Sequence, residues 1–213
     1  MKFDKKDLLL YAVTDRRWAK DKTLCEQVKE ALEGGVSLVQ LREKDLSYSE
    51  FITEAFEIQK ICNEFQIPFI INDNLKVMLD VNADGIHIGQ EDMDASVVRK
   101  RIGNDKILGV SVQTVEQAME AEKNGADYLG VGAVFPTGSK DDASDVDLET
   151  LKNICEAVRI PVVAIGGIGL HNMKELKGSG IAGIAVISAI FSKKEIKEAA
   201  EELKNAVSFL IKS

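Results

Sequence analysis

Short runs of apolar residues recur along the chain, and segments with a helical period separate them. Most of these runs are almost continuously hydrophobic, which is typical of strands that are buried on both faces and therefore run parallel to their neighbours. We expect strands at residues 8–13, 37–41, 68–71, 85–88, 107–110, 128–131, 161–165 and 181–187.

The segments between these runs predict helices. In residues 49–65, apolar side chains from Phe51 to Cys62 recur at the helical period and form one stripe. Gly34 and Gly125 mark the ends of two further helices. These two helices span residues 23–33 and 115–123, and the remaining expected helices span residues 74–79, 95–101, 148–158, 171–176 and 194–211.

Eight predicted strands therefore alternate with eight predicted helices. The 213 residues divided by eight give about 27 residues per unit, which is close to the minimum for a strand, a helix and two short turns. We predict a single compact α/β domain over residues 1–213 that forms a (β/α)8 TIM barrel. The alternative is an open doubly wound sheet, but eight strands favour the barrel because closure removes both edge strands.

Composition and charge limit the classes of partner. The net charge of −8 argues against a general nucleic-acid-binding surface, and any anionic substrate must be held by a local cluster of cations. The N-terminal segment is charged and predicts neither a signal peptide nor a membrane span. Cys25, Cys62 and Cys155 show no paired spacing, and we interpret them as buried reduced thiols of a cytoplasmic protein.

The chemistry of such barrels lies at the carboxyl ends of the strands. Arg42 and Lys44 follow the second predicted strand and alternate, so both point the same way and can hold a phosphate or diphosphate. Asp73 follows the third strand, where an Asp between two amides suits either the N-cap of the next helix or a site for a hard cation. Asp92 follows the fourth strand after a turn at Gly89. Because these strands are neighbours, the two carboxylates are expected to converge on a Mg²⁺ ion.

Polar residues also follow the later strands. Ser111 can donate a hydrogen bond to a substrate oxygen, whereas His87 lies inside a strand and is expected to be a hydrogen-bonded histidine of the barrel interior. The polar loop at 135–146 carries Thr137 and Lys140 and is expected to contact phosphate, as lid loops at this face often do.

The last two strands predict a second anion site. Gly166-Gly167 follows the seventh strand and Ser188 follows the eighth, where barrels of this type often bind phosphate through backbone N–H groups. Two anion sites at one rim indicate group transfer between two phosphorylated substrates.

Taken in order, these motifs resemble the thiamine phosphate synthase family. The resemblance runs from about residue 11 to residue 189, and several short motifs in one order are far more specific than any single motif. The matching segments are QLREK at 40–44, ND at 72–73, GIHIGQED at 85–92, GVS at 109–111, PTGSK at 136–140, IGGI at 165–168 and IS at 187–188.

The resemblance implies an enzyme that transfers a pyrimidinylmethyl group from its diphosphate to the nitrogen of a thiazole phosphate, with Mg²⁺ as cofactor. In the family mechanism diphosphate leaves first, a pyrimidine-methyl cation forms, and the thiazole nitrogen attacks that cation. Arg42, Lys44 and Lys140 would be the catalytic residues, because they stabilise the charge of the leaving diphosphate.

Carried over by motif, the site residues form three groups. The pyrimidine diphosphate would be held by Gln40, Arg42, Lys44, Asn72 and Lys140, and its pyrimidine would contact Ser111. Mg²⁺ would be held by Asp73 and Asp92. The thiazole phosphate would be held by Thr137, Ser139, Gly167, Ile187 and Ser188. Leu41, Glu43 and Gly138 lie within the same motifs and are expected to contact substrate as well. Ser139 stands where the family usually has Thr, and because the hydroxyl is retained we expect binding to persist.

Three other kinds of function compete with this one. A thiazole tautomerase of the same barrel would lack the metal carboxylates and would carry a His near Gln113. A sugar-phosphate epimerase or an indole-pathway enzyme needs an acid–base pair at the mouth, where cations outnumber candidate bases here. A non-catalytic barrel that only binds a phosphorylated ligand would show no turnover. The expected partners are small molecules, and the sequence leaves the oligomeric state open, a homo-oligomer included.

Overall fold

The strands close into a barrel in which every neighbouring pair is parallel. The computed structural model describes residues 3–137 and 146–212, and within them the strand order runs from β1 to β8 before β8 returns to β1. The strands are β1 (Leu10–Val13), β2 (Leu38–Leu41), β3 (Phe69–Asn72), β4 (Gly85–Ile88), β5 (Ile107–Val112), β6 (Tyr128–Val131), β7 (Val162–Ile165) and β8 (Gly183–Val186). The predicted TIM barrel is confirmed, and the open doubly wound sheet is excluded.

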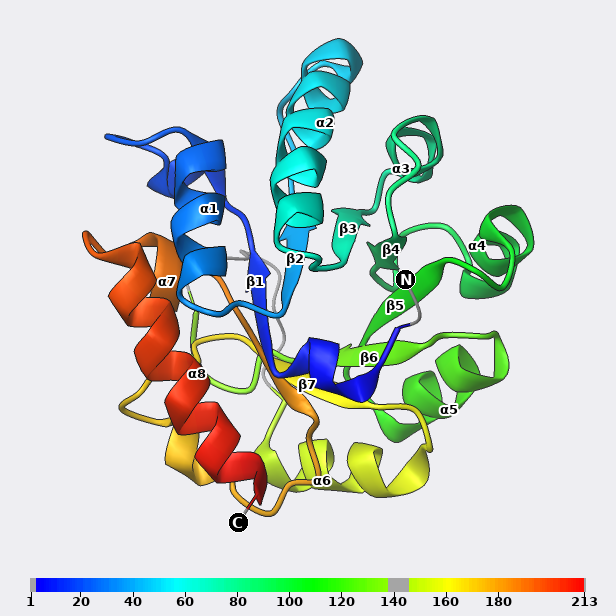
Figure 1. Ribbon diagram of the computed structural model, residues 1–213. Coiled ribbons are helices and arrows are strands. Elements are labelled where there is room, and N and C mark those ends of the chain that lie inside the picture. Colours follow the sequence, from blue (N-terminus) through cyan, green and yellow to red (C-terminus); the bar gives the residue numbers. More distant parts are fainter. Residues whose placement is uncertain (1–2, 138–145, 213) are drawn as a thin grey trace.

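Helices form an outer ring around the strands (Figure 1). They are α1 (Leu24–Glu33), α2 (Tyr48–Glu64), α3 (Leu75–Asp80), α4 (Ala95–Ile102), α5 (Val115–Lys123), α6 (Leu148–Ala157), α7 (Ser188–Phe191) and α8 (Ile196–Lys212). The described residues also form three 3-10 helices, namely η1 (Lys5–Leu8), η2 (Arg16–Trp18) and η3 (Met173–Leu176). Capping boxes begin α1 and α2, where the Thr23 and Ser47 side chains accept from backbone N–H groups three residues on.

Two predicted elements contain a 3-10 helix in the structure, whereas the other predicted elements differ by at most two residues at either end. The expected strand at 8–13 begins only at Leu10, because Asp4 and Asp7 form a capping box that folds the preceding residues into η1. The expected helix at 171–176 is only the short η3. Its would-be cap, Asn172, instead accepts from Gly169 N at 2.9 Å and donates to the Gly167 carbonyl at 2.9 Å, so its side chain holds the loop.

Residues on the strands alternate between two cores. On β1, Leu10 and Ala12 pack toward the helices, whereas Tyr11 and Val13 fill the barrel interior. Fully buried Leu8 of η1 joins the interior core. The apolar run at 8–13 therefore contains the end of η1 and all of β1, and hydrophobicity alone does not show where one ends and the other begins.

The backbone at the end of η1 packs closely against Gly183 of β8, and substitution of this glycine tests that contact. A Cβ atom there would lie 1.8 Å from the Leu8 carbonyl oxygen and 2.7 Å from Leu9 Cα, and backbone cannot give way as a flexible side chain can. We expect Gly183→Ala to lower the free energy of unfolding by about 3 kcal/mol.

The matched control is Gly178→Ala. Gly178 has a φ of +78°, but among the described residues beyond its two chain neighbours no atom lies within 4 Å of its added Cβ. Its loss is expected to be about 1 kcal/mol, from backbone strain alone. Urea unfolding of both variants measures the difference, and equal losses would contradict the close packing of η1 against β8.

None of the helices within the described ranges has the length and apolarity that crossing a membrane requires.

Candidate active site

A cavity of about 670 Å³ opens at the carboxyl ends of the strands. This volume lies within the range of roughly 300–1,000 Å³ that is typical of small-molecule sites. The predicted site residues found in its lining are Arg42, Glu43, Lys44, Asn72, Asp73, Asp92, Ser111, Thr137, Gly167, Ile187 and Ser188. The structure therefore brings both predicted anion sites and the predicted metal carboxylates to one mouth.

Other predicted residues lie elsewhere. Leu41 is fully buried in the core between the strands and the helices, because alternation along β2 turns it away from the barrel axis. The structure thus does not bring the Leu41 side chain to the mouth. Gln40 is 4% exposed, and its amide donates to the Tyr11 hydroxyl. Gly138, Ser139 and Lys140 lie outside the described residues, as does most of the predicted 135–146 loop.

The two predicted metal carboxylates meet beside a lysine. Lys44 Nζ lies 2.6 Å from Asp73 Oδ2, and Asn72 Nδ2 donates to Asp73 Oδ1 at 2.6 Å. Burial raises the pKa of Asp73, Lys44 opposes that rise, and the interacting Asp92 carboxylate adds to it. Asp92 itself accepts from Gly89 N at 2.7 Å, which fixes the turn after β4.

This donor set fits a magnesium ion that arrives with a diphosphate. Among the described residues, no group of three or more His, Cys, Asp or Glu side chains forms a complete metal cage. Mg²⁺ usually takes only one or two protein carboxylates and completes its shell with water and substrate phosphate. Asp73 and Asp92 supply such a pair on one wall of the cavity.

The Nε atom of Arg42 is a buried hydrogen-bond donor. Its backbone N donates to Thr14 Oγ1 at 3.0 Å, but within the described part of the chain its Nε atom has no hydrogen-bond partner. A buried unsatisfied donor costs roughly 1–3 kcal/mol, so native structures rarely leave one without a reason. Because Arg42 lines the cavity, an anionic ligand is a fitting partner.

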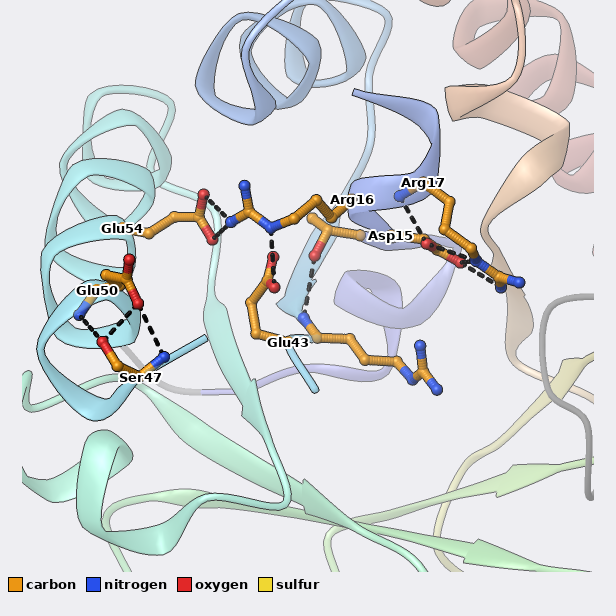
Figure 2. A network of polar contacts seen from close by, with 9 residues as sticks. Asp15, Arg16, Arg17, Glu43, Ser47, Glu50 and Glu54 are labelled. Atoms are coloured by element: carbon orange, nitrogen blue, oxygen red, sulfur yellow. Dashed lines mark hydrogen bonds and ion pairs between the residues drawn. The ribbon is translucent and has the colours of Figure 1, made fainter. Parts of the chain in front are cut away.

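The loop after β1 adds charged residues that sequence reasoning missed. Figure 2 shows Asp15 facing Arg17, whose Nη2 lies 2.7 Å from Asp15 Oδ2. Both residues line the cavity. Asp15 and Arg17 directly follow a strand, the same positional signal that identified Arg42 and Asp73.

Arg16 connects this loop to the segment that follows β2 and to α2 (Figure 2). Its Nε lies 3.1 Å from Glu43 Oε2, and its Nη2 lies 2.7 Å from Glu54 Oε1. The Glu43 side chain is only 3% exposed, and burial raises its pKa to about 7, with Arg16 lowering it and Glu54 raising it. Glu43, which the motif placed among the substrate contacts, thus has its carboxylate engaged by Arg16.

Glu43→Gln is expected to change how stability depends on pH. A carboxyl group with a raised pKa in the folded state prefers the neutral form, so its contribution to stability is present below its ordinary pKa near 4.5 and is lost as the pH rises through about 7. Glutamine mimics the neutral form at every pH. Relative to the unsubstituted protein, the variant should therefore be more stable at pH 8 than it is at pH 5, as measured by urea unfolding. A difference that is the same at both values would contradict the raised pKa.

The opposite wall of the cavity is built from glycines. Gly167 has a φ of +63°, and a Cβ there would lie 2.5 Å from the Pro136 carbonyl oxygen and 2.8 Å from that of Phe135. The loop after β7 therefore packs directly against the loop after β6. Ile187 and Ser188 follow β8 at the same wall, where TIM barrels commonly bind phosphate.

His87 connects this mouth to the interior of the barrel. It is 8% exposed, with Nδ1 2.9 Å from the Tyr128 hydroxyl and Nε2 2.8 Å from Ser111 Oγ. This confirms a hydrogen-bonded interior histidine. Ser111 lies within β5, which is two residues longer than predicted, and reaches the cavity from there.

The cysteines take no part in the cavity lining found among the described residues. Cys62 is buried as expected, but Cys25 and Cys155 are partly exposed, so the expectation of buried thiols is wrong for these two. Burial raises the pKa of Cys25 and of Cys155 to about 11, so both remain protonated thiols at neutral pH.

Comparison with known proteins agrees with the geometry. The profile of the family "Thiamine monophosphate synthase" matches residues 10–190. The chain is 55% identical over 197 residues to the thiamine-phosphate synthase of Clostridium tetani, covering 92% of this chain and 94% of that protein. It is 54% identical over 197 residues to that of Ruminiclostridium cellulolyticum, with the same coverage of 92% and 94%.

A solved structure gives the same result. The thiamine phosphate pyrophosphorylase of Pyrococcus furiosus superposes with a TM-score of 0.89 at 42% identity, covering 97% of this chain and 98% of that one. From the family match, the identities and this superposition, it follows that the chain belongs to the thiamine monophosphate synthase family.

Proposed function

We propose that the chain transfers the pyrimidinylmethyl group of hydroxymethylpyrimidine diphosphate to the nitrogen of a thiazole phosphate. The reaction releases diphosphate and forms thiamine phosphate. One observation carries the proposal: cationic Arg42 and Lys44, the carboxylates of Asp73 and Asp92, and the glycine-rich wall of Gly167 line the same cavity. Relatives at 54–55% identity bear the name thiamine-phosphate synthase, which supports the same reaction.

The leaving diphosphate is assigned to the wall formed by the ends of β2, β3 and β4. Arg42 offers a planar fork of donors, Lys44 a point charge, and Asn72 an amide. Asp73 and Asp92 would hold Mg²⁺, which when bound supplies positive charge to the diphosphate oxygens. The Lys140 ammonium stays a prediction from the sequence.

The second substrate is assigned to the opposite wall. Backbone N–H groups near Gly167 and Ser188, with the Thr137 side chain, suit a phosphate monoester. Ser139 and Gly138 stay predictions from the sequence. This arrangement faces the thiazole ring toward the pyrimidine held near Ser111.

The chemistry then needs no nucleophilic side chain. The bond between the pyrimidine methylene carbon and the diphosphate oxygen breaks, and the electron pair leaves with diphosphate. The thiazole nitrogen donates its lone pair to the resulting methylene cation and forms the new carbon–nitrogen bond. Arg42 and Lys44 stabilise the departing charge, and the two walls align the reactants, an effect that contributes roughly 7–11 kcal/mol in well-oriented cases.

A tautomerase or a purely ligand-binding barrel would use this cavity differently. Gln113 lines the cavity at the position where the tautomerase motif carries His, and an amide cannot serve as a general base. Simple binding of a phosphorylated ligand would not require a second anion-binding wall.

The test is release of diphosphate from the two substrates, followed together with formation of thiamine phosphate. Both products are expected in equal amounts with Mg²⁺ present, and neither after chelation by EDTA. Binding of both substrates without product would overturn the proposal in favour of a ligand-binding barrel.

A cytoplasmic location and small-molecule partners belong to the same proposal.

A further inference from the structure

A line of hydrogen-bonded side chains runs through the barrel interior to the mouth. The Gln40 amide donates to the Tyr11 hydroxyl, which lies 2.8 Å from the Tyr128 hydroxyl. That hydroxyl lies 2.9 Å from His87 Nδ1, and His87 Nε2 lies 2.8 Å from Ser111 Oγ. Tyr11 is 1% and Tyr128 is 0% exposed, so bulk water has no access to these two hydroxyls.

The barrel wall leaves room for this line. A Cβ atom at Gly109 would lie 2.3 Å from the Tyr128 hydroxyl oxygen and 2.5 Å from His87 Nδ1. A Cβ atom at Gly130 would lie 3.1 Å from His87 Cε1. Glycines on β5 and β6 thus provide the space that the His87 and Tyr128 rings occupy.

The donor at one end determines the direction of every bond along the line. The Gln40 nitrogen can only donate, so the Tyr11 hydroxyl accepts from it, and the Tyr128 oxygen is the neighbouring acceptor that can take the Tyr11 proton. Tyr128 in turn gives its proton to His87 Nδ1. Burial raises the pKa of both tyrosines, so both protons remain in place at neutral pH.

A neutral imidazole that accepts at Nδ1 carries its proton on Nε2. His87 Nε2 therefore donates to Ser111 Oγ. The serine hydroxyl then has a filled acceptor site and one proton of its own, which is available to a molecule in the cavity that Ser111 lines.

We propose that this buried line fixes Ser111 as a hydrogen-bond donor toward the bound substrate, with His87, Tyr128 and Tyr11 as positioning residues. The inference rests on the proposed function for the identity of that substrate. The substrate atom that faces Ser111 is then an acceptor, such as a ring nitrogen of the pyrimidine, and not its amino group. The hydrogen-bonded line thereby determines which edge of the pyrimidine ring faces Ser111, and it favours a ring that has an acceptor nitrogen at that edge.

The direct test is the tautomer of His87 in the ligand-free protein, read by ¹⁵N NMR of its ring nitrogens. The chain has two histidines, so the His171→Asn variant leaves the signals of His87 alone. We expect protonated Nε2 and unprotonated Nδ1. The opposite tautomer would mean that His87 Nδ1 donates to the Tyr128 hydroxyl and that Ser111 gives its own proton to His87 Nε2. Ser111 could then only accept a hydrogen bond from the substrate, which would overturn the proposal. This readout needs no turnover, so its failure is distinct from failure of the proposed function.

A second test asks whether Tyr128 acts through Ser111. Tyr128→Phe removes the proton given to Nδ1, and we expect the fixed tautomer to be lost and the KM for the pyrimidine diphosphate to rise about 10-fold, the KM for the thiazole phosphate staying unchanged. Ser111→Ala should have a similar effect, and the double variant should stay within about twofold of Ser111→Ala alone. Independent losses that multiply in the double variant would overturn the positioning role, because a general packing defect acts whether or not Ser111 is present.

Discussion

Replacement of Asp92 by asparagine is expected to lower kcat for diphosphate release by at least about 100-fold, with the fold intact. Asparagine keeps an oxygen that can accept from Gly89 N, the bond that holds the turn after β4. What it removes is a negative charge beside Asp73. With a single carboxylate left, Mg²⁺ should bind more weakly, and the activity that remains should require a higher Mg²⁺ concentration.

The chain offers a matched control two residues away. Asp94 is the N-cap of α4, and asparagine caps helices about as well as aspartate, so Asp94→Asn should change neither activity nor stability. Steady-state rates across a Mg²⁺ titration measure both variants. If Asp92→Asn kept near-normal turnover in EDTA, the assignment of these carboxylates to the metal would be wrong.

The barrel could be predicted because buried parallel strands have a simple signature. Continuous apolar runs identified all eight strands, and the residues after them identified the mouth. The predictions of the strand start at residue 8 and of the helix at 171–176 failed because these segments are shaped by tertiary contacts, which the local sequence pattern does not show. Leu8 has the same apolar character as Leu10, yet it turns into the interior on η1, and the side chain of Asn172 serves the loop after β7 instead of a helix.

The site was predictable in part for the same reason. Position after a strand sufficed for Arg42, Lys44 and Asp73, because the carboxyl ends of the parallel strands meet at the mouth of the barrel. It could not reveal that Glu43 is bound by Arg16, since that pair depends on how the loop after β1 folds. It also could not reveal the interior line, because Tyr128 in an apolar run reads as an ordinary core aromatic.

Removal of the Lys44 ammonium is the second change with a large expected effect. Lys44 Nζ lies 2.6 Å from Asp73 Oδ2 and faces the cavity beside Arg42. In Lys44→Ala we expect kcat to fall about 100-fold, because a charge that stabilises the departing diphosphate is lost. The KM for the thiazole phosphate should stay unchanged, because that substrate is assigned to the opposite wall near Gly167.

The same variant should alter the pH dependence of activity. Lys44 lowers the pKa of Asp73 against the effects of burial and of Asp92, so its removal lets that pKa rise further. Asp73 must be ionised to hold a cation, and the acidic limb of the rate profile should therefore move to higher pH. Lys76→Ala is the control, since Lys76 is an exposed lysine of α3 that lies 2.8 Å from Asp80, and surface pairs of this kind contribute little. A loss in Lys44→Ala confined to thiazole-phosphate affinity would contradict the placement of the diphosphate at Lys44.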